Sequence, residues 1–210
     1  MDHVEHDAVM GSAWGGGTRP FAMGSKKLGM WLFIISDSLT FTALLVTYSY
    51  LRLASPDWPR PFPFSPSILF STAMTVVLLA SSLTMVFGVA AAARGDRGAA
   101  VKWILATMLG GAGFIGLHMR EWLHLIEEGL RPFGNPWGGS PVFGAVFFGI
   151  TGLHMTHVAI GVIYLGIVAF GFGKSKFSAE DVEVSGLYWH FVDLVWMFVF
   201  PLVYLMSVKY

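Results

Sequence analysis

The chain contains no cysteine in its 210 residues. Disulfide bonds, iron–sulfur clusters and copper centres built on thiolates are therefore excluded. Any redox centre held by this chain would have to rest on histidine, of which there are seven. Charged residues are also scarce, because they make up 12% of the chain, against about 25% of an ordinary soluble domain.

The charges that are present do not gather in one place. The 13 basic residues are scattered and are balanced by 13 acidic ones, so the basic stripe of a nucleic-acid-binding protein is missing. We therefore exclude nucleic acid as a partner. What the chain has in abundance is apolar surface: 55% of its residues are hydrophobic and its mean hydropathy is +0.64. These values indicate an integral membrane protein.

Five apolar runs reach the length of about 20 residues that a helix needs to cross a bilayer. They lie at residues 28–53, 67–93, 99–125, 142–172 and 187–208. Segments rich in proline or glycine separate most of them, whereas residues 173–186 are mainly charged and are expected to form a solvated connector. The sequence predicts an all-α, polytopic membrane bundle of five transmembrane helices, with residues 28–210 as one domain.

The distribution of lysine and arginine predicts the orientation of this bundle. The N-terminal segment, the second-to-third connection and the fourth-to-fifth connection carry eight basic residues: Arg19, Lys26, Lys27, Arg94, Arg97, Lys102, Lys174 and Lys176. The opposite side carries five: Arg52, Arg60, Arg120, Arg131 and Lys209. By the positive-inside rule the N-terminus is cytoplasmic and the C-terminus periplasmic. Residues 1–27 are polar and lack the order of a cleaved signal peptide, so we expect a flexible cytoplasmic tail.

Tryptophan and glycine mark the expected helix ends and helix contacts. Six tryptophans lie near predicted helix ends, as an interfacial aromatic belt would place them: Trp31, Trp58, Trp103, Trp122, Trp137 and Trp189. Small-residue faces run along the third and fourth helices: Gly110, Gly111, Gly113 and Gly116, then Gly149, Gly152, Gly161 and Gly166. Such faces favour close helix packing.

An aspartate and two histidines are expected close to the middle of the membrane. Asp37 lies ten residues past Lys27, hence about 15 Å into the membrane. An isolated carboxylate is so unfavourable there that it should be protonated or hydrogen-bonded to a neighbouring helix. His154 and His157 share a helix face and lie about 20 and 24 Å from the outer end of the fourth helix. We therefore expect one of these imidazoles to hydrogen-bond Asp37.

Two further polar pairs occur in the third and fifth segments. His118 and Glu121 are expected about 24–28 Å along the third helix, at the outer headgroup region, with lipid contact and interhelix contact both open. His190 and Asp193 are one helical turn apart in the fifth segment. Because His190 would begin that helix near the cytoplasmic face, its depth would differ from that of His157 by about 10 Å. This offset argues against a shared haem or zinc, so no metal ligand is predicted.

Three segments resemble subunit III of the haem–copper terminal oxidases, the cytochrome c and quinol oxidases of respiratory membranes. The first is residues 29–37, which end in the buried carboxylate Asp37. The second is residues 152–161, with a glycine-and-histidine signature, and the third is residues 188–196, Tyr-Trp-His-Phe-Val-Asp-Leu-Val-Trp, the most specific of them. Phe114 and Glu121 extend the resemblance to the third helix. Asp37 stands where many cytochrome c oxidase members have glutamate, and His118 where many have glutamine.

The resemblance implies an accessory subunit with no catalytic residue, haem or copper of its own. Haem and copper would lie in partner subunits, with the catalytic subunit I alongside this chain in a bacterial inner membrane. It further implies bound phospholipid in a cleft between the first two helices and the rest, and support of proton uptake and turnover lifetime. Asp37, with His154 or His157, is the candidate proton-uptake site; His118, Glu121, Trp189, His190 and Asp193 are candidates for structural or lipid contacts.

Two other functions remain as alternatives. Aspartate and histidine within the membrane also suit the proton relay of a small proton channel or transporter. Against this, no inverted repeat or broken helix is evident in the sequence. A membrane cytochrome b would require histidine pairs at equal depth, which the predicted offset disfavours.

Overall fold

The computed structural model describes residues 24–209 and is built almost entirely from long helices. These helices are α2 (Ser25–Ala54), α3 (Leu69–Ala93), α4 (Arg97–Glu127), α5 (Phe143–Gly173) and α6 (Ala179–Val199). Together with the short helical segments that extend α3 and α6, all five are long and apolar enough to cross a membrane. The predicted all-α membrane bundle is therefore confirmed. The predicted tail falls mostly on residues 1–23, which lie outside the described residues.

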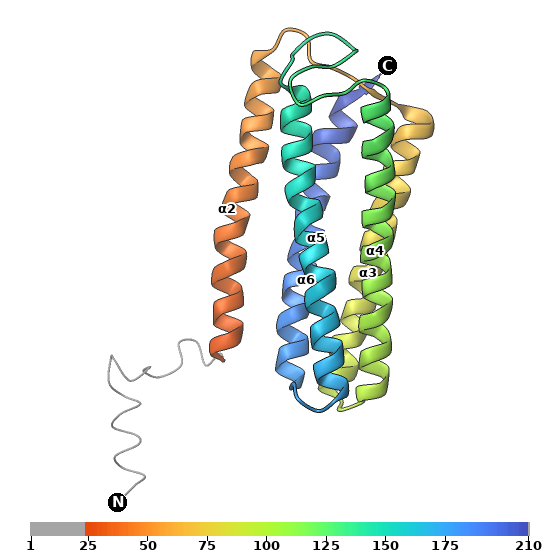
Figure 1. Cartoon of the computed structure of the whole chain (residues 1–210). Coiled ribbons are helices and arrows are strands. Elements are labelled where there is room, and N and C mark those ends of the chain that lie inside the picture. The colour runs from red at the N-terminus through yellow and green to blue at the C-terminus, as the bar shows by residue number, and fades with distance from the viewer. Residues whose placement is uncertain (1–23, 210) are drawn as a thin grey trace, which may run out of the picture.

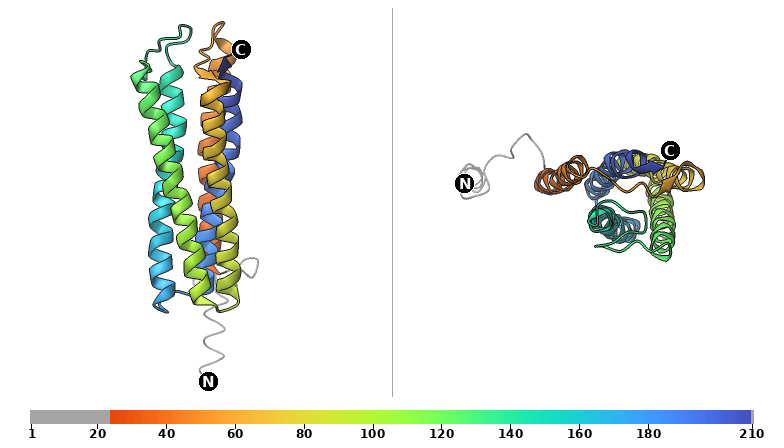
Figure 2. Two further views of the ribbon diagram at one scale, coloured as in Figure 1. Left: turned by 90° about the vertical axis from the view of Figure 1, so that its right-hand side faces the viewer. Right: turned by 90° about the horizontal axis from the view of Figure 1, so that it is seen from above.

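Four of the helices enclose the core and the fifth stands at one edge. Helices α3, α4, α5 and α6 pack in a closed ring, with α3 also against α6. Helix α2 contacts mainly α6 and, more weakly, α5, and the view from above places α2, α6 and α3 in a row (Figure 2). Because α2 and α3 follow each other in the chain but are not neighbours in the bundle, the loop between them crosses the end of the bundle at which α2 ends (Figure 1).

The charged segment predicted as a solvated connector is mostly helix. Helix α6 begins at Ala179, eight residues before the predicted start. Ser178 and Asp181 form a capping box, in which the Ser178 side chain bonds the Asp181 backbone and the Asp181 carboxylate bonds the Ser178 backbone. Lys26 and Lys27, predicted to end the tail, lie in the first turn of α2 and pair with Asp181 and Glu183. The charges thus join two helix ends instead of marking a loop.

Short segments close the end of the bundle at which α2 ends. The π-helical segment η2 (Phe64–Ile68) leads into α3, and η3 (Phe200–Tyr204) and η4 (Leu205–Ser207) extend α6. Strands β1 (Phe62–Pro63) and β2 (Val208–Lys209) pair in parallel. This pairing fastens the chain before α3 to the end of the chain after α6. The aromatic ring of Tyr204 stacks on that of Phe62 at 4.9 Å beneath the strands.

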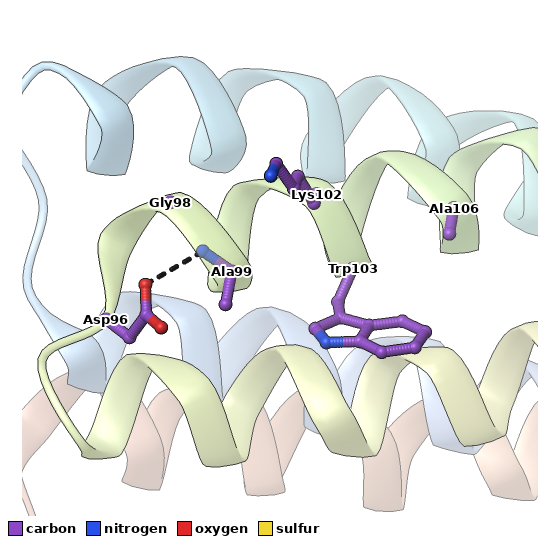
Figure 3. A pocket seen from close by; sticks show the side chains of 6 residues that line it. All are labelled: Asp96, Gly98, Ala99, Lys102, Trp103 and Ala106. Carbon is purple, nitrogen blue, oxygen red and sulfur yellow. Dashed lines mark hydrogen bonds between the residues drawn. The ribbon is translucent and has the colours of Figure 1, made fainter.

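The opposite end carries the tight turn between α3 and α4. Gly95 adopts a φ of +79° there, which glycine tolerates best. The Asp96 carboxylate accepts a hydrogen bond from the Ala99 amide at 2.9 Å and so caps α4. Figure 3 shows this cap beside an open pocket that Lys102 and Trp103 also line. The Asp96 carboxylate is thus engaged in ending a turn and starting a helix.

Candidate functional site

The structure brings Asp37 of α2 to His157 of α5. The Asp37 Oδ2 and His157 Nε2 atoms are 3.3 Å apart, without the alignment of a hydrogen bond, and the side chains are 15% and 13% exposed. His157 Nδ1 lies 2.8 Å from the Leu153 carbonyl oxygen. Since a carbonyl only accepts, Nδ1 must carry a proton. The neutral imidazole then turns the lone pair on Nε2 toward the carboxyl group, so a proton on either atom would be shared across this contact.

Aromatic side chains of two helices, α2 and α6, lie beside this pair. The Tyr188 hydroxyl of α6 donates to the His157 carbonyl at 3.0 Å. The Phe41 ring of α2 lies edge-on to the His157 imidazole, with 5.3 Å between ring centroids. The pair is consequently enclosed at the meeting point of α2, α5 and α6, and apolar surroundings strengthen any electrostatic interaction inside it.

His154, the other candidate partner, faces away from Asp37. Its side chain is fully buried, and its Nε2 donates to the Val192 carbonyl of α6 at 3.0 Å. The ring packs on Trp196 and against Phe114, at centroid distances of 4.8 and 5.6 Å. His154 therefore joins α5 to α6, and only His157 is brought to the carboxylate.

His118 and Glu121 lie inside the bundle, between helices. Glu121 is 6% exposed and accepts hydrogen bonds from Ser71 Oγ at 2.6 Å and from the Tyr204 hydroxyl at 2.9 Å. His118 is fully buried among the rings of Phe114 and Trp196. The inner face of α4 is covered here by α3 and by the extension of α6, so these side chains meet neighbouring helices and not lipid. The interhelix alternative describes both residues.

Trp189 is a core residue and does not belong to an interfacial belt. It is 1% exposed, and its indole nitrogen donates to Ser81 Oγ at 3.1 Å. The ring fills the space left by two glycines: a Cβ placed on Gly111 would lie 2.3 Å from it, and one on Gly161 would lie 3.0 Å from it. The belt prediction fails because α6 begins earlier than expected, which moves Trp189 toward the centre of the helix.

The same shift overturns the depth predicted for His190. His190 lies eleven residues into α6, about 17 Å from its start, and the hydrogen bond of Tyr188 to His157 shows that the two regions are level. The predicted 10 Å offset from His157 is therefore wrong. The two imidazoles still face different neighbours, since His190 Nδ1 lies 2.6 Å from Ser82 Oγ of α3. Within residues 24–209, no group of three or more histidine or acidic side chains is arranged to hold a metal.

A groove of about 440 Å³ runs along the contact between α2 and α6. Its walls are almost wholly apolar apart from hydroxyl groups: Ser38, Phe41, Thr42, Leu45, Val46 and Ser49 on α2, and Phe191, Leu194, Val195, Phe198 and Leu202 on α6 and its extension. The expected cleft between the first two helices and the rest is not formed in the described part of the chain, because α3 packs against α4 and α6. The groove separates α2 alone from the bundle.

Sequence reasoning missed the hydroxyl partners of these polar groups. Ser71 and Tyr204 bind Glu121, Ser82 binds His190, and Thr75 accepts from the Trp196 indole at 2.9 Å. Three of the four lie on α3. Spacings of four and seven residues place Ser71, Thr75 and Ser82 on neighbouring turns of an otherwise apolar helix. This row of hydroxyl-bearing residues was the signal in the sequence for a helix with buried hydrogen-bond partners.

The fold and the site define a polytopic membrane subunit whose buried acids and imidazoles meet side chains or carbonyls of neighbouring helices. The family described as cytochrome c oxidase subunit III matches residues 2–208. The chain is 34% identical over 187 residues to cytochrome c oxidase subunit 3 of Bacillus subtilis (strain 168), covering 87% of each chain. It is 31% identical to quinol oxidase subunit 3 of Bacillus spizizenii, covering 99% of this chain and 98% of the relative.

A third relative is cytochrome bo(3) ubiquinol oxidase subunit 3 of Pseudomonas aeruginosa, 32% identical over 88% of this chain and 86% of the relative. The chain therefore belongs to the cytochrome c oxidase subunit III family. It is an accessory subunit of a terminal oxidase complex. The sequence resemblance to subunit III is confirmed.

Proposed function

We propose that this chain lies beside the catalytic haem–copper subunit I in a bacterial inner membrane and supports its proton uptake and turnover lifetime. The haems and copper are assigned to the partner subunits. The observation that carries the proposal is the contact of Asp37 with His157. The lysines that begin α2 are assigned to the cytoplasmic side, which puts the C-terminal strand β2 on the periplasmic side.

The arrangement of protons supports this role for Asp37. Because His157 Nδ1 donates to Leu153, one extra proton, carried on Asp37 or on His157 Nε2, would turn the contact between Nε2 and the carboxyl group into a hydrogen bond. In both forms the pair is neutral overall, which the membrane interior favours. A site of this kind accepts or releases its proton when its surroundings change, and can supply protons locally to a neighbouring subunit.

Replacing Asp37 with asparagine tests this role in the intact oxidase. Asp37→Asn removes the group that can carry the proton, so we expect carbodiimide labelling of this chain to be lost, proton uptake to slow and turnover lifetime to shorten. Purified complexes from native membranes give all three readouts. The matched control is Asp37→Glu, which keeps a carboxyl group and should preserve labelling.

Two outcomes would contradict this proposal, and each would contradict a different part of it. If Asp37→Asn behaves as the unchanged complex in all three measurements, the proton role is refuted while membership of the complex stands. If the unchanged chain does not co-isolate with haem-bearing partners and instead moves protons alone in vesicles, the accessory role fails in favour of a small proton channel.

We assign a phospholipid acyl chain to the groove between α2 and α6. Its apolar walls match a lipid tail, and the serine and threonine hydroxyls on α2 already bond to carbonyls of their own helix, as Thr42 does to Ser38 at 2.7 Å. The hydroxyls therefore leave no strong demand for a polar occupant. Arg52 continues the same helix face one turn beyond Ser49, where a lipid phosphate would lie.

Filling the groove should displace this lipid. Val46→Trp puts an indole ring into the groove wall, so we expect about one phospholipid fewer per chain in the purified complex. Phosphorus analysis and native mass spectrometry measure the count. Leu39→Trp is the matched control, because Leu39 lies on the same helix, is 67% exposed and does not line the groove. An equal lipid count in the two variants would remove the assignment.

A further inference from the structure

A second polar cluster lies between α3 and α6, on a different side of α6 from Asp37. His190 Nδ1 is 2.6 Å from Ser82 Oγ, and Asp193 follows His190 by one turn of α6, with its Oδ1 atom buried and without a hydrogen-bond partner among the described residues. Asp193 is 7% exposed, whereas His190 and Ser82 are only half-buried. The hydrogen-bonded pair of His190 and Ser82 thus reaches the surface of the bundle at the imidazole.

This cluster reaches the surface at the middle of the membrane. Within the spanning segment Ala179–Ser207, His190 and Asp193 lie about 17 and 21 Å from its start. The His190 Nε2 atom has no partner among residues 24–209 and is not enclosed by them. An unpartnered imidazole nitrogen costs free energy in hydrocarbon. Ionisable groups at this depth consequently face protein or a water-filled cavity and not acyl chains.

The side chains around the cluster are apolar and partly exposed in the described part of the chain. Leu79 and Val86 flank Ser82 on neighbouring turns of α3 and are 38% and 48% exposed. Met197, two turns after His190 on α6, is 44% exposed. We call the surface of Leu79, Ser82, Val86, His190 and Met197 the α3–α6 seam. Helices α6 and α3, which carry it, stand next to each other in the row of α2, α6 and α3 (Figure 2), and its apolar residues flank one polar point.

We propose that the α3–α6 seam is the surface on which a transmembrane helix of the catalytic subunit packs. That helix carries a hydrogen-bonding side chain opposite His190 Nε2. The apolar residues of the seam fit the flanks of such a helix, and the single polar point fixes its depth and rotation, as interhelical hydrogen bonds do in membranes. This inference rests on the proposed place of the chain beside subunit I and adds which face makes that contact.

Single-cysteine labelling tests the location of the interface. Since the chain has no cysteine, Leu79→Cys and Met197→Cys each provide its only thiol for a nitroxide spin label. We expect the collision rate of these labels with dissolved oxygen to fall strongly in the assembled oxidase relative to the chain expressed alone. Leu109→Cys and Ile163→Cys are matched controls on exposed faces of α4 and α5 (75% and 64% exposed) and should not change.

A second set of variants tests the hydrogen bond. His190→Leu should weaken retention of the chain in the detergent-solubilised oxidase by about threefold, the effect of one interhelical hydrogen bond in a membrane, whereas His190→Gln should restore it. Thr156→Val, on the exposed face of α5, is the control. If the chain co-isolates with haem-bearing partners while the labels on the seam remain as accessible to oxygen as the control labels, that result would overturn this inference and leave the proposed function standing. Failure to co-isolate overturns the proposed function together with it.

Discussion

Gly111→Val is expected to destabilise the folded chain by about 3 kcal/mol or more, because it overpacks the centre of the bundle. The new side chain would begin 2.3 Å from the Trp189 ring. The ring cannot retreat, since the Gly161 backbone closes its other side and the indole nitrogen is bonded to Ser81. The whole indole is 1% exposed, so no outward rotation is open to it without losing α4–α5–α6 packing.

Thermal unfolding of the purified chain in detergent, followed by tryptophan fluorescence and near-ultraviolet circular dichroism, measures this effect. Gly116→Val is the matched control on the same helix, because a Cβ there has no neighbour within 4 Å. The control should change stability little, by about 0.5 kcal/mol or less. Equal unfolding temperatures for the two variants would show that Trp189 is free to move, contrary to the packing described here.

The sequence predicted the features that depend on composition and on the length of apolar runs. Apolar runs of membrane-spanning length located all five helices, since hydrocarbon leaves the backbone few alternatives to a helix. The proximity of Asp37 to one of two histidines was foreseeable as well, because a depth of about 15 Å follows from rise per residue alone, but the hydrogen bond expected between them is not formed. The sequence could not predict that His157, and not His154, meets Asp37. Both histidines lie on one helix face, and only the tertiary packing turns His154 toward Val192.

The wrong predictions for Trp189 and His190 follow from the wrong start predicted for α6. A charged stretch next to an apolar run predicts a loop, but the charges of Asp181 and Glu183 are paired with lysines of α2 and Asp181 also caps α6. Moving the start of α6 by eight residues moved Trp189 from an interface to the core and His190 to the middle of the membrane. The capping signal at Ser178 and Asp181 was present in the sequence. The hydrogen bond of the Tyr204 hydroxyl to Glu121 depends on how η3 packs against α4. No local sequence pattern encodes that packing.

Tyr204→Phe should cost roughly 1.5–3 kcal/mol, the value of a hydrogen bond to a charged group. The substitution keeps the ring, so its stacking on Phe62 remains, and removes only the hydroxyl that donates to Glu121 at 2.9 Å. Because Glu121 is 6% exposed, water cannot easily replace the lost donor. The carboxylate would be left with Ser71 alone, and adding Ser71→Ala should therefore cost more than the sum of the two single changes.

Tyr48→Phe provides the matched control for this effect. The Tyr48 hydroxyl is also buried at the outer end and is 3.0 Å from Ser207 Oγ, but its partner is neutral. Its loss should cost about 0.5–1.5 kcal/mol. Equilibrium or thermal unfolding in detergent compares the two, and repeating Tyr204→Phe in a Glu121→Gln background isolates the charge. If the cost of Tyr204→Phe matches that of Tyr48→Phe and does not change in this background, Glu121 is not held as a charged acceptor. The link between α3, α4 and η3 would then rest on ring packing alone.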